Sequence, residues 1–145
     1  MGRSLFTSFV HKHAKVRMAG LNALFDVMVC GKWKHSHAVL SHMVGFRDPN
    51  VIPIKDFYEP STKLNYFANF VADRSVVVRE CFYRTMGDML ARLPDRADHE
   101  GRLFPYLISG LHDQNDSIGQ AVFEIIEELG QLHEEENEEK FRERK

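Results

Sequence analysis

The amino-acid sequence predicts an all-α fold, an α-solenoid of antiparallel helix pairs with one proline-rich insertion. The first observation that predicts this fold is a repeated sequence pattern. Val78-Arg79 in mid-chain is matched forty residues later by Ile118-Gly119, and Val16-Arg17 begins the same pattern near the start. A fixed-period copy of one amphipathic helix is typical of stacked helical repeats, which usually bind partners. We therefore expect a binding protein rather than an enzyme.

The helical spacing of apolar residues is the second observation, and it places the first helices. Residues 15–30 carry apolar side chains at the i, i+3, i+4 and i+7 positions of a helix, and nearly the whole circumference of that helix is apolar. A helix of this kind is normally buried on both sides, so a neighbouring element should cover it. A short apolar helix is expected before it, with Leu5, Phe6, Phe9 and Val10.

A proline-rich stretch at residues 47–60 is the third observation, and it interrupts the array. A further helix is expected near residues 36–46, but three prolines then follow within twelve residues and cannot lie in a helix interior. This stretch explains why the first spacing, from Val16 to Val78, is 62 residues rather than forty. Its apolar content predicts an insertion that packs along the helices.

Helix caps place the second helix pair. Ser61 or Thr62 can cap a helix that should end near Asp73, and Ser75 can cap the helix that follows. One face of this second helix is predicted to point inward, with Val78, Cys81, Phe82, Met86, Met89, Leu90 and Leu93.

Helix-breaking residues and a glycine indicate where the helices of the third pair begin and end. Its first helix should begin near Leu103, with Pro105 tolerated in the first turn, and Gly130 can end its second helix. The chain is thus predicted to be a single domain over 1–145, with repeats at 4–46, 61–93 and 101–132, the insertion at 47–60 and a charged tail at 133–145.

Composition and charge exclude several function classes. The chain has 145 residues and a formal net charge of -2, and its last twelve residues hold six acids and four bases, so the body is neutral and the tail acidic. A neutral body lacks the basic footprint of nucleic-acid binding. Cys30 and Cys81 indicate a reducing compartment rather than a disulfide framework. Without a run of eighteen apolar residues, we expect a soluble, cytoplasmic chain that has no membrane partner.

Metal and catalytic chemistry find little support in the residues. His11 and His13, like His35 and His37, are spaced so that their side chains would point apart on a helix, and no further ligand motif completes a site. His42 on an apolar face is expected to be a hydrogen-bonded core residue. The sequence also lacks a glycine-rich phosphate loop and a nucleophile elbow. We therefore assign no catalytic, cofactor-binding or metal-binding residue.

The second helices of successive repeats are expected to present a binding surface that changes from apolar to mixed to acidic. A partner with an apolar anchor and a basic end would complement this gradient. The outer positions are Met18, Asn22 and Phe25, then Glu80, Arg84 and Asp88, and then Gln120, Glu124 and Glu127.

An Asp in the turn between two helices and a Val-Arg pair that opens the second helix resemble HEAT repeats. Asp73 with Val78-Arg79 is closest to that pattern. Gly119 replaces the Arg in the third copy, and His11-Lys12-His13 stands where the first copy would have its Asp. The resemblance implies an inter-repeat ladder of Asp and Arg that this chain supplies only in part.

Within HEAT proteins, residues 73–145 are similar to the dynein axonemal assembly factors. This resemblance implies a non-enzymatic cytoplasmic scaffold for preassembly of the dynein arms of cilia and flagella, with dynein chains and chaperones as partners. It also implies an excerpt of a longer array, whose uncapped ends could self-associate. The similarity rests on Val78-Arg79 with Met86-Gly87, on Leu93-Pro94-Asp95-Arg96 before Leu103-Phe104-Pro105-Tyr106-Leu107, and on Ser109-Gly110-Leu111 leading to Glu135-Glu136-Asn137-Glu138-Glu139.

Two other interpretations remain open. One is a different HEAT adaptor, such as a transport or phosphatase scaffold. The other is a di-iron enzyme like deoxyhypusine hydroxylase, a HEAT-repeat protein built on four His-Glu pairs. This chain has two such pairs, His99-Glu100 and His133-Glu134. We expect His99 in a loop and His133 after a finished helix, where they would not form an iron site.

Overall fold

The computed structural model describes residues 2–30, 38–40, 43 and 65–144, and no strand occurs among them. The all-α prediction is confirmed. In chain order the elements are α1 (Gly2–Phe9), α2 (Ala14–Cys30), α5 (Tyr66–Val71), α6 (Val76–Arg92), α7 (Arg96–Ser109), the short 3-10 helix η1 (Gly110–His112) and α8 (Asp116–Glu143).

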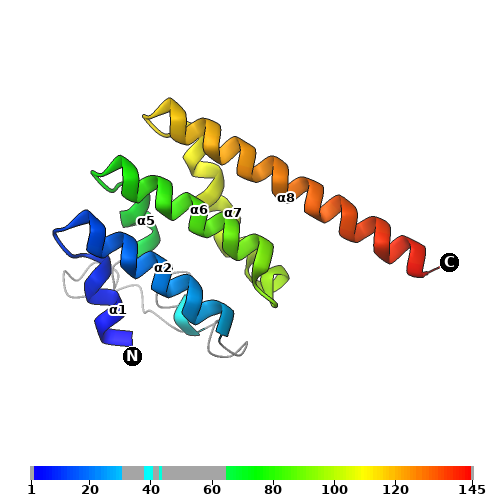
Figure 1. The fold of residues 1–145 in the computed structure, drawn as a ribbon, viewed down its shortest axis with the longest axis horizontal. Helices are drawn as coiled ribbons and strands as arrows, with labels where there is room; N and C mark the ends of the chain where they lie inside the picture. Colours follow the sequence, from blue (N-terminus) through cyan, green and yellow to red (C-terminus); the bar gives the residue numbers. More distant parts are fainter. Residues whose placement is uncertain (1, 31–37, 41–42, 44–64, 145) are drawn as a thin grey trace, which may run out of the picture.

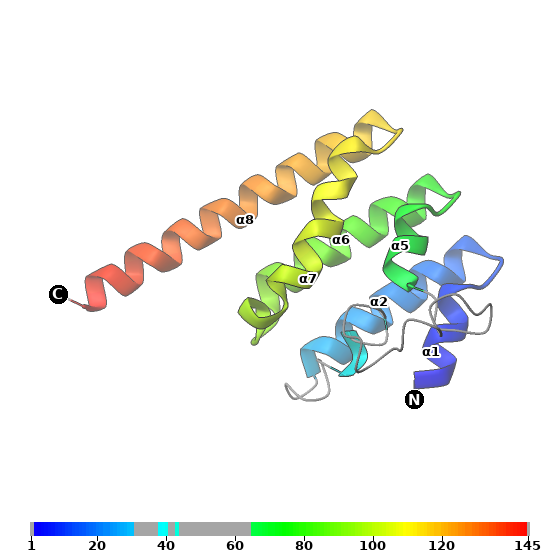
Figure 2. The ribbon, with the colours of Figure 1, turned by 180° about the vertical axis from the view of Figure 1, so that it is seen from behind.

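The helices form two layers, as expected for a repeat solenoid. Figure 1 shows α2, α6 and α8 side by side and nearly parallel, and Figure 2 shows α1, α5 and α7 lying across their other side. Each pair consists of a first helix, a tight turn and a longer second helix. The predicted α-solenoid of antiparallel helix pairs is therefore confirmed.

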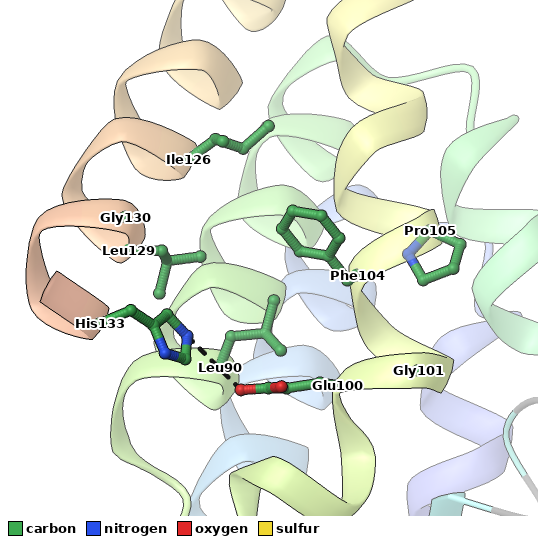
Figure 3. Close-up of a pocket in the computed structure, with 9 residues that line it drawn as sticks. All are labelled: Leu90, Glu100, Gly101, Phe104, Pro105, Ile126, Leu129, Gly130 and His133. Atoms are coloured by element: carbon green, nitrogen blue, oxygen red, sulfur yellow. Dashed lines mark ion pairs between the residues drawn. The ribbon is translucent and has the colours of Figure 1, made fainter. Parts of the chain in front are cut away.

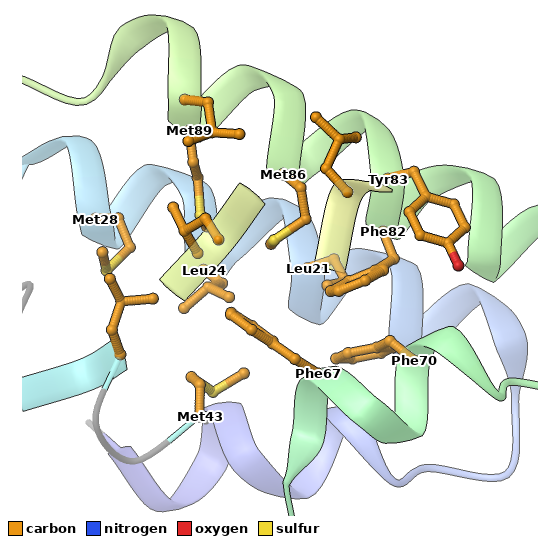
Figure 4. Packing of buried hydrophobic residues seen from close by; sticks show 14 of the residues in the cluster. Leu21, Leu24, Met28, Met43, Phe67, Phe70, Phe82, Tyr83, Met86 and Met89 are labelled. Atoms are coloured by element: carbon orange, nitrogen blue, oxygen red, sulfur yellow. The ribbon is translucent and has the colours of Figure 1, made fainter. Parts of the chain in front are cut away.

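A single apolar core lies between the layers in the described part of the chain (Figure 4). Phe70 of α5 stacks on Phe82 of α6, with ring centroids 5.5 Å apart and an interplanar angle of 18°, and Phe67 meets the same ring from another side at 5.5 Å. Leu21 and Leu24 of α2 are fully buried against them. This packing joins the first two helix pairs into one body.

A ladder of buried ion pairs fixes the register of the second helices. Arg17 of α2 binds Asp73 through Nε to Oδ2 at 2.8 Å and Nη2 to Oδ1 at 3.0 Å. Arg79 of α6 binds Asp113 in the same way, at 2.9 and 3.2 Å. Both pairs are bidentate and nearly excluded from solvent, which is the strongest geometry for such contacts. Each Arg thus ties its own helix to the turn of the next pair.

Each ladder Asp also starts the helix that follows it. Asp73 Oδ1 accepts a hydrogen bond from the backbone N–H of Ser75 at 2.8 Å, and Asp113 Oδ1 accepts one from the N–H of Asn115 at 2.9 Å. These side chains satisfy donors that a helix start leaves open. The ladder stops in the third copy, where a Cβ on Gly119 would lie 3.3 Å from the carbonyl oxygen of Leu111. The described part of the chain therefore forms two rungs.

Three expected helix boundaries are wrong, and α7 is the first. It begins at Arg96 rather than Leu103, so Pro105 lies inside the helix and His99 lies on it rather than in a loop. The first turn of α7 is polar and gives no apolar period, but it is held by a 2.8 Å hydrogen bond between His99 Nε2 and Asp95 Oδ2. Because His99 is buried, this bond fixes the start of the helix.

The other two corrections concern Gly130 and the cap of α5. α8 passes through Gly130 and continues to Glu143, so His133 lies within the helix rather than after it. An Arg96–Glu136 ion pair to α7 supports this extension. At α5 the cap is Asn65, whose Oδ1 accepts from the N–H of Ala68 at 3.1 Å.

Several expectations fall largely outside the described residues. These are the insertion at 47–60 and most of the helix near 36–46. Ser61 and Thr62 also lie outside the described residues, but the helix that they are expected to cap begins after Asn65. Within residues 36–46, Leu40 and Met43 are described, and both are fully buried in the core. No helix in the described part of the chain is long and apolar enough to cross a membrane.

Candidate protein-binding surfaces

The nine outer positions of α2, α6 and α8, here called the second-helix ridge, are the predicted binding surface. Asn22, Arg84, Asp88, Gln120, Glu124 and Glu127 are exposed, whereas Met18, Phe25 and Glu80 are half-buried. Since α2, α6 and α8 lie side by side (Figure 1), these positions are carried by neighbouring helices in one layer.

The apolar end of the ridge offers less free surface than the acidic end. Phe25 packs against the core, and the guanidinium of Arg92 on α6 lies over its ring, 6.0 Å from the centroid. Glu80 and Arg84 form an exposed ion pair at 2.9 Å, which partly neutralises the middle of the ridge. The α8 end is the most strongly charged, because this helix carries ten acidic and two basic residues.

A second surface, which the sequence did not predict, is an apolar cleft between α7 and α8. It has a volume of about 480 Å³, within the range of ligand-binding pockets. Figure 3 shows it with α7 on one side, α8 on the other and Leu90 of α6 below. The lining residues are Leu90, Glu100, Gly101, Phe104, Pro105, Ile126, Leu129, Gly130 and His133.

The cleft exists because α8 packs closely against η1, which follows α7, while α7 and α8 themselves are joined by polar side chains further along. Near their junction, a Cβ on Gly110 would lie 2.7 Å from Val122 and 2.9 Å from the ring of Tyr83. Further along, Glu100 faces His133 at 3.4 Å, and the Arg96–Glu136 pair lies beyond it. The cleft lies between these contacts.

Two glycines line the cleft and place no side chain in it. No neighbouring atom lies within 4 Å of the point where a Cβ would stand on Gly101 or on Gly130. A helical glycine without a close neighbour costs helix stability and gains no packing in return. Two such glycines in amphipathic segments indicate a gap in the packing, but the sequence alone does not place that gap between α7 and α8.

The described residues that could support chemistry are engaged in other ways. Burial raises the pKa of the Cys81 thiol, so the reactive thiolate is disfavoured. The four residues of the two His-Glu pairs do not converge, because His99 is turned into the core against Asp95 while Glu100 faces His133. No group of three or more potential metal ligands occurs in the described part of the chain, and His35, His37 and His42 lie outside it.

Stacked helix pairs joined by an Asp–Arg ladder define this protein as an α-solenoid of the helical-repeat class. Residues 59–144 match a family described as "Dynein axonemal assembly factor 5-like, TPR repeats", and the chain belongs to this family. The resemblance to dynein axonemal assembly factors is thereby confirmed.

Two curated relatives are similar over nearly the whole chain. Dynein axonemal assembly factor 5 of Xenopus laevis is 27% identical over 142 residues, which are 98% of this chain and 14% of the relative. The protein of that name from Homo sapiens is 27% identical over 140 residues, which are 97% of this chain and 14% of the relative. The chain therefore spans about one seventh of their length. No solved structure matches.

Proposed function

We propose that this chain is a non-enzymatic scaffold segment that binds proteins during cytoplasmic preassembly of axonemal dynein arms. The single observation that carries the proposal is the family match over residues 59–144, because that family is described by an axonemal dynein assembly factor. Its partners in this role are dynein chains and the chaperones that accompany their folding.

The geometry supports a binding role through rigidity. The Arg17–Asp73 and Arg79–Asp113 rungs hold α2, α6 and α8 in one register, so the second-helix ridge is ordered before a partner arrives. Preordered surfaces lose less conformational entropy on association than flexible ones. The acidic end on α8 favours partners that carry basic segments, and it should speed their encounter at low salt.

A pull-down from ciliated cells tests the proposal directly. The tagged 145-residue chain should recover dynein chains and chaperones as the dominant proteins. Recovery of transport receptors or phosphatase subunits in their place would favour the alternative adaptor function and overturn the dynein role. Iron in the purified chain, measured by elemental analysis, would reopen the di-iron enzyme.

Ridge variants test which surface is used. Asp88→Lys and Glu124→Lys reverse exposed charges on α6 and α8 and should each reduce recovery of the partners several-fold. Phe25→Asp tests the apolar end, with circular dichroism to verify folding because Phe25 is half-buried. Asn69→Lys adds a charge to an exposed position on α5, in the other layer, and serves as the matched control. Equal recovery with all four variants would exclude the ridge as the binding surface.

A further inference from the structure

The α7–α8 cleft combines an apolar interior with one acidic lining residue, Glu100, and it lies beside a strongly acidic helix. Leu90, Phe104 and Leu129 supply apolar surface from three different helices. α8, which forms one wall, carries ten acidic against two basic residues, whereas α7 carries two of each. A binding partner for this cleft must therefore satisfy both an apolar space and a negative surrounding.

A backbone acceptor adds to the negative character of the cleft. Pro105 lies inside α7 and has no N–H, so the carbonyl of Gly101 lacks the donor that a helix normally provides four residues later. Gly101 and Pro105 both line the cleft. A carbonyl that receives no bond from the residue four positions later can accept one from a ligand N–H, such as that of an ammonium or guanidinium group.

The Glu100 carboxylate is available to the same kind of donor. Its contact with His133 is 3.4 Å long, and the two side chains are 39% and 48% exposed. A pair this exposed is held weakly, so a lysine or arginine of a partner can replace the histidine at little cost.

We propose that the α7–α8 cleft binds a segment of a partner protein in which one bulky apolar side chain is flanked by lysine or arginine. The apolar side chain enters the space between Leu90, Phe104 and Leu129, and the flanking cations pair with Glu100, the Gly101 carbonyl and the glutamates of α8. This site is separate from the second-helix ridge and does not depend on a role in dynein assembly.

The binding experiment uses a fluorescein-labelled peptide of eleven residues with a central Phe and two Lys on each side. Its fluorescence polarisation is measured against the whole chain. Two further peptides separate the contributions, one with the Phe replaced by Ala and one with the four Lys replaced by Glu. Binding to the parent peptide should be at least tenfold tighter than binding to either variant, because the apolar anchor and the cations act together.

Protein variants locate the binding to the cleft. Gly130→Leu places a side chain into open space on α8, and it should weaken peptide binding at least tenfold while leaving the protein folded. Glu100→Lys should weaken it similarly. Gln131→Leu adds the same side chain at the next, exposed position, which faces away from the cleft, and should leave binding unchanged.

Three outcomes would overturn the proposal. The first is binding that survives Gly130→Leu, and the second is binding that does not depend on the peptide's Phe. Either would show attraction to the acidic helix alone. The third is self-association that Gly130→Leu abolishes, measured by light scattering, which would identify a second copy as the occupant. These readouts use no ciliary extract, so their failure and that of the proposed function are distinguishable.

Discussion

Glycine has opposite effects at the contact between α6 and α8 and at the cleft between α7 and α8. A Cβ on Gly87 of α6 would lie 2.5 Å from Cγ2 of Ile125 on α8, so glycine there permits close packing of two second helices. On the same α8, Gly130 has no such neighbour and leaves a cleft. Gly87 thus allows two helices to pack closely, whereas Gly130 leaves open space beside α8.

The ion pairs of the two regions also differ, because those between repeats are buried and the one across the cleft is exposed. Arg17 and Asp73, which join successive repeats, have side chains only 7% and 9% exposed. Glu100 and His133, which span the cleft, are 39% and 48% exposed. Buried, bidentate pairs lock a structure when both partners are present, whereas exposed pairs contribute little. The repeats are therefore joined rigidly, while the last pair retains an open cleft.

The largest expected effect comes from breaking the ladder. Asp73→Ala removes both bonds to Arg17, leaves that buried guanidinium without its carboxylate and exposes the N–H of Ser75. We expect a loss of about 3–5 kcal/mol in the free energy of unfolding, measured by urea denaturation.

The exposed Glu80–Arg84 pair on α6 provides the control for the ladder. Glu80→Ala should change the free energy of unfolding by no more than about 0.5 kcal/mol. If the two substitutions cost the same, the ladder does not lock the repeats, and the contrast with the cleft is lost.

The second prediction compares the two glycines directly. Gly87→Ala forces Ile125 to move and should destabilise the protein by about 1–2 kcal/mol, after the helix-forming advantage of alanine is counted. Gly130→Ala meets nothing and should stabilise it by about 0.5–1 kcal/mol. Thermal unfolding of the two variants gives both signs. Shifts in the same direction would show that the packing at these sites does not differ as described.

Apolar periodicity was sufficient to predict the second helices of the first two pairs. Residues 15–30 were predicted as a helix, and α2 spans Ala14–Cys30. Of the seven residues predicted to face inward on α6 and at its C-terminal end, six are buried, and only Cys81 is partly exposed. These helices pack on both sides, so their hydrophobic pattern is strong and the tertiary structure agrees with it.

The start of α7 and the cleft could not be predicted because they depend on contacts across the fold. The polar first turn of α7 has no apolar period, and the Asp95–His99 hydrogen bond that holds it becomes evident only when His99 is seen to be buried. The ladder partners Arg17 and Asp73 are 56 residues apart, so the sequence gives the residue types but not the pairing. The cleft depends on the angle between α7 and α8, which no local pattern encodes.

The smallest expected effect is on local opening of α8 and concerns the Arg96–Glu136 ion pair beyond the cleft. A hydrogen bond from Arg96 holds the pKa of the Glu136 carboxyl below its ordinary value. A carboxyl with a lowered pKa in the folded state stabilises that state above its unfolded pKa, about 4.3, and loses this contribution as the pH falls through the lower, folded value. The extension of α8 should therefore open more readily in acid.

Hydrogen exchange of residues 131–143 measures this opening, after correction for the intrinsic exchange rate. At pH 6, Glu136→Gln should exchange faster than the unmodified chain, because the charged tie to Arg96 is lost. Near pH 3 the difference between the two proteins should be smaller, because protonation of Glu136 increases as the pH falls towards its lowered pKa. Glu138→Gln is the control, because its 3.8 Å contact with Arg142 is 72–81% exposed and should have no measurable effect. A difference between Glu136→Gln and the unmodified chain that persists undiminished at pH 3 would show that charge does not hold the far end of the cleft.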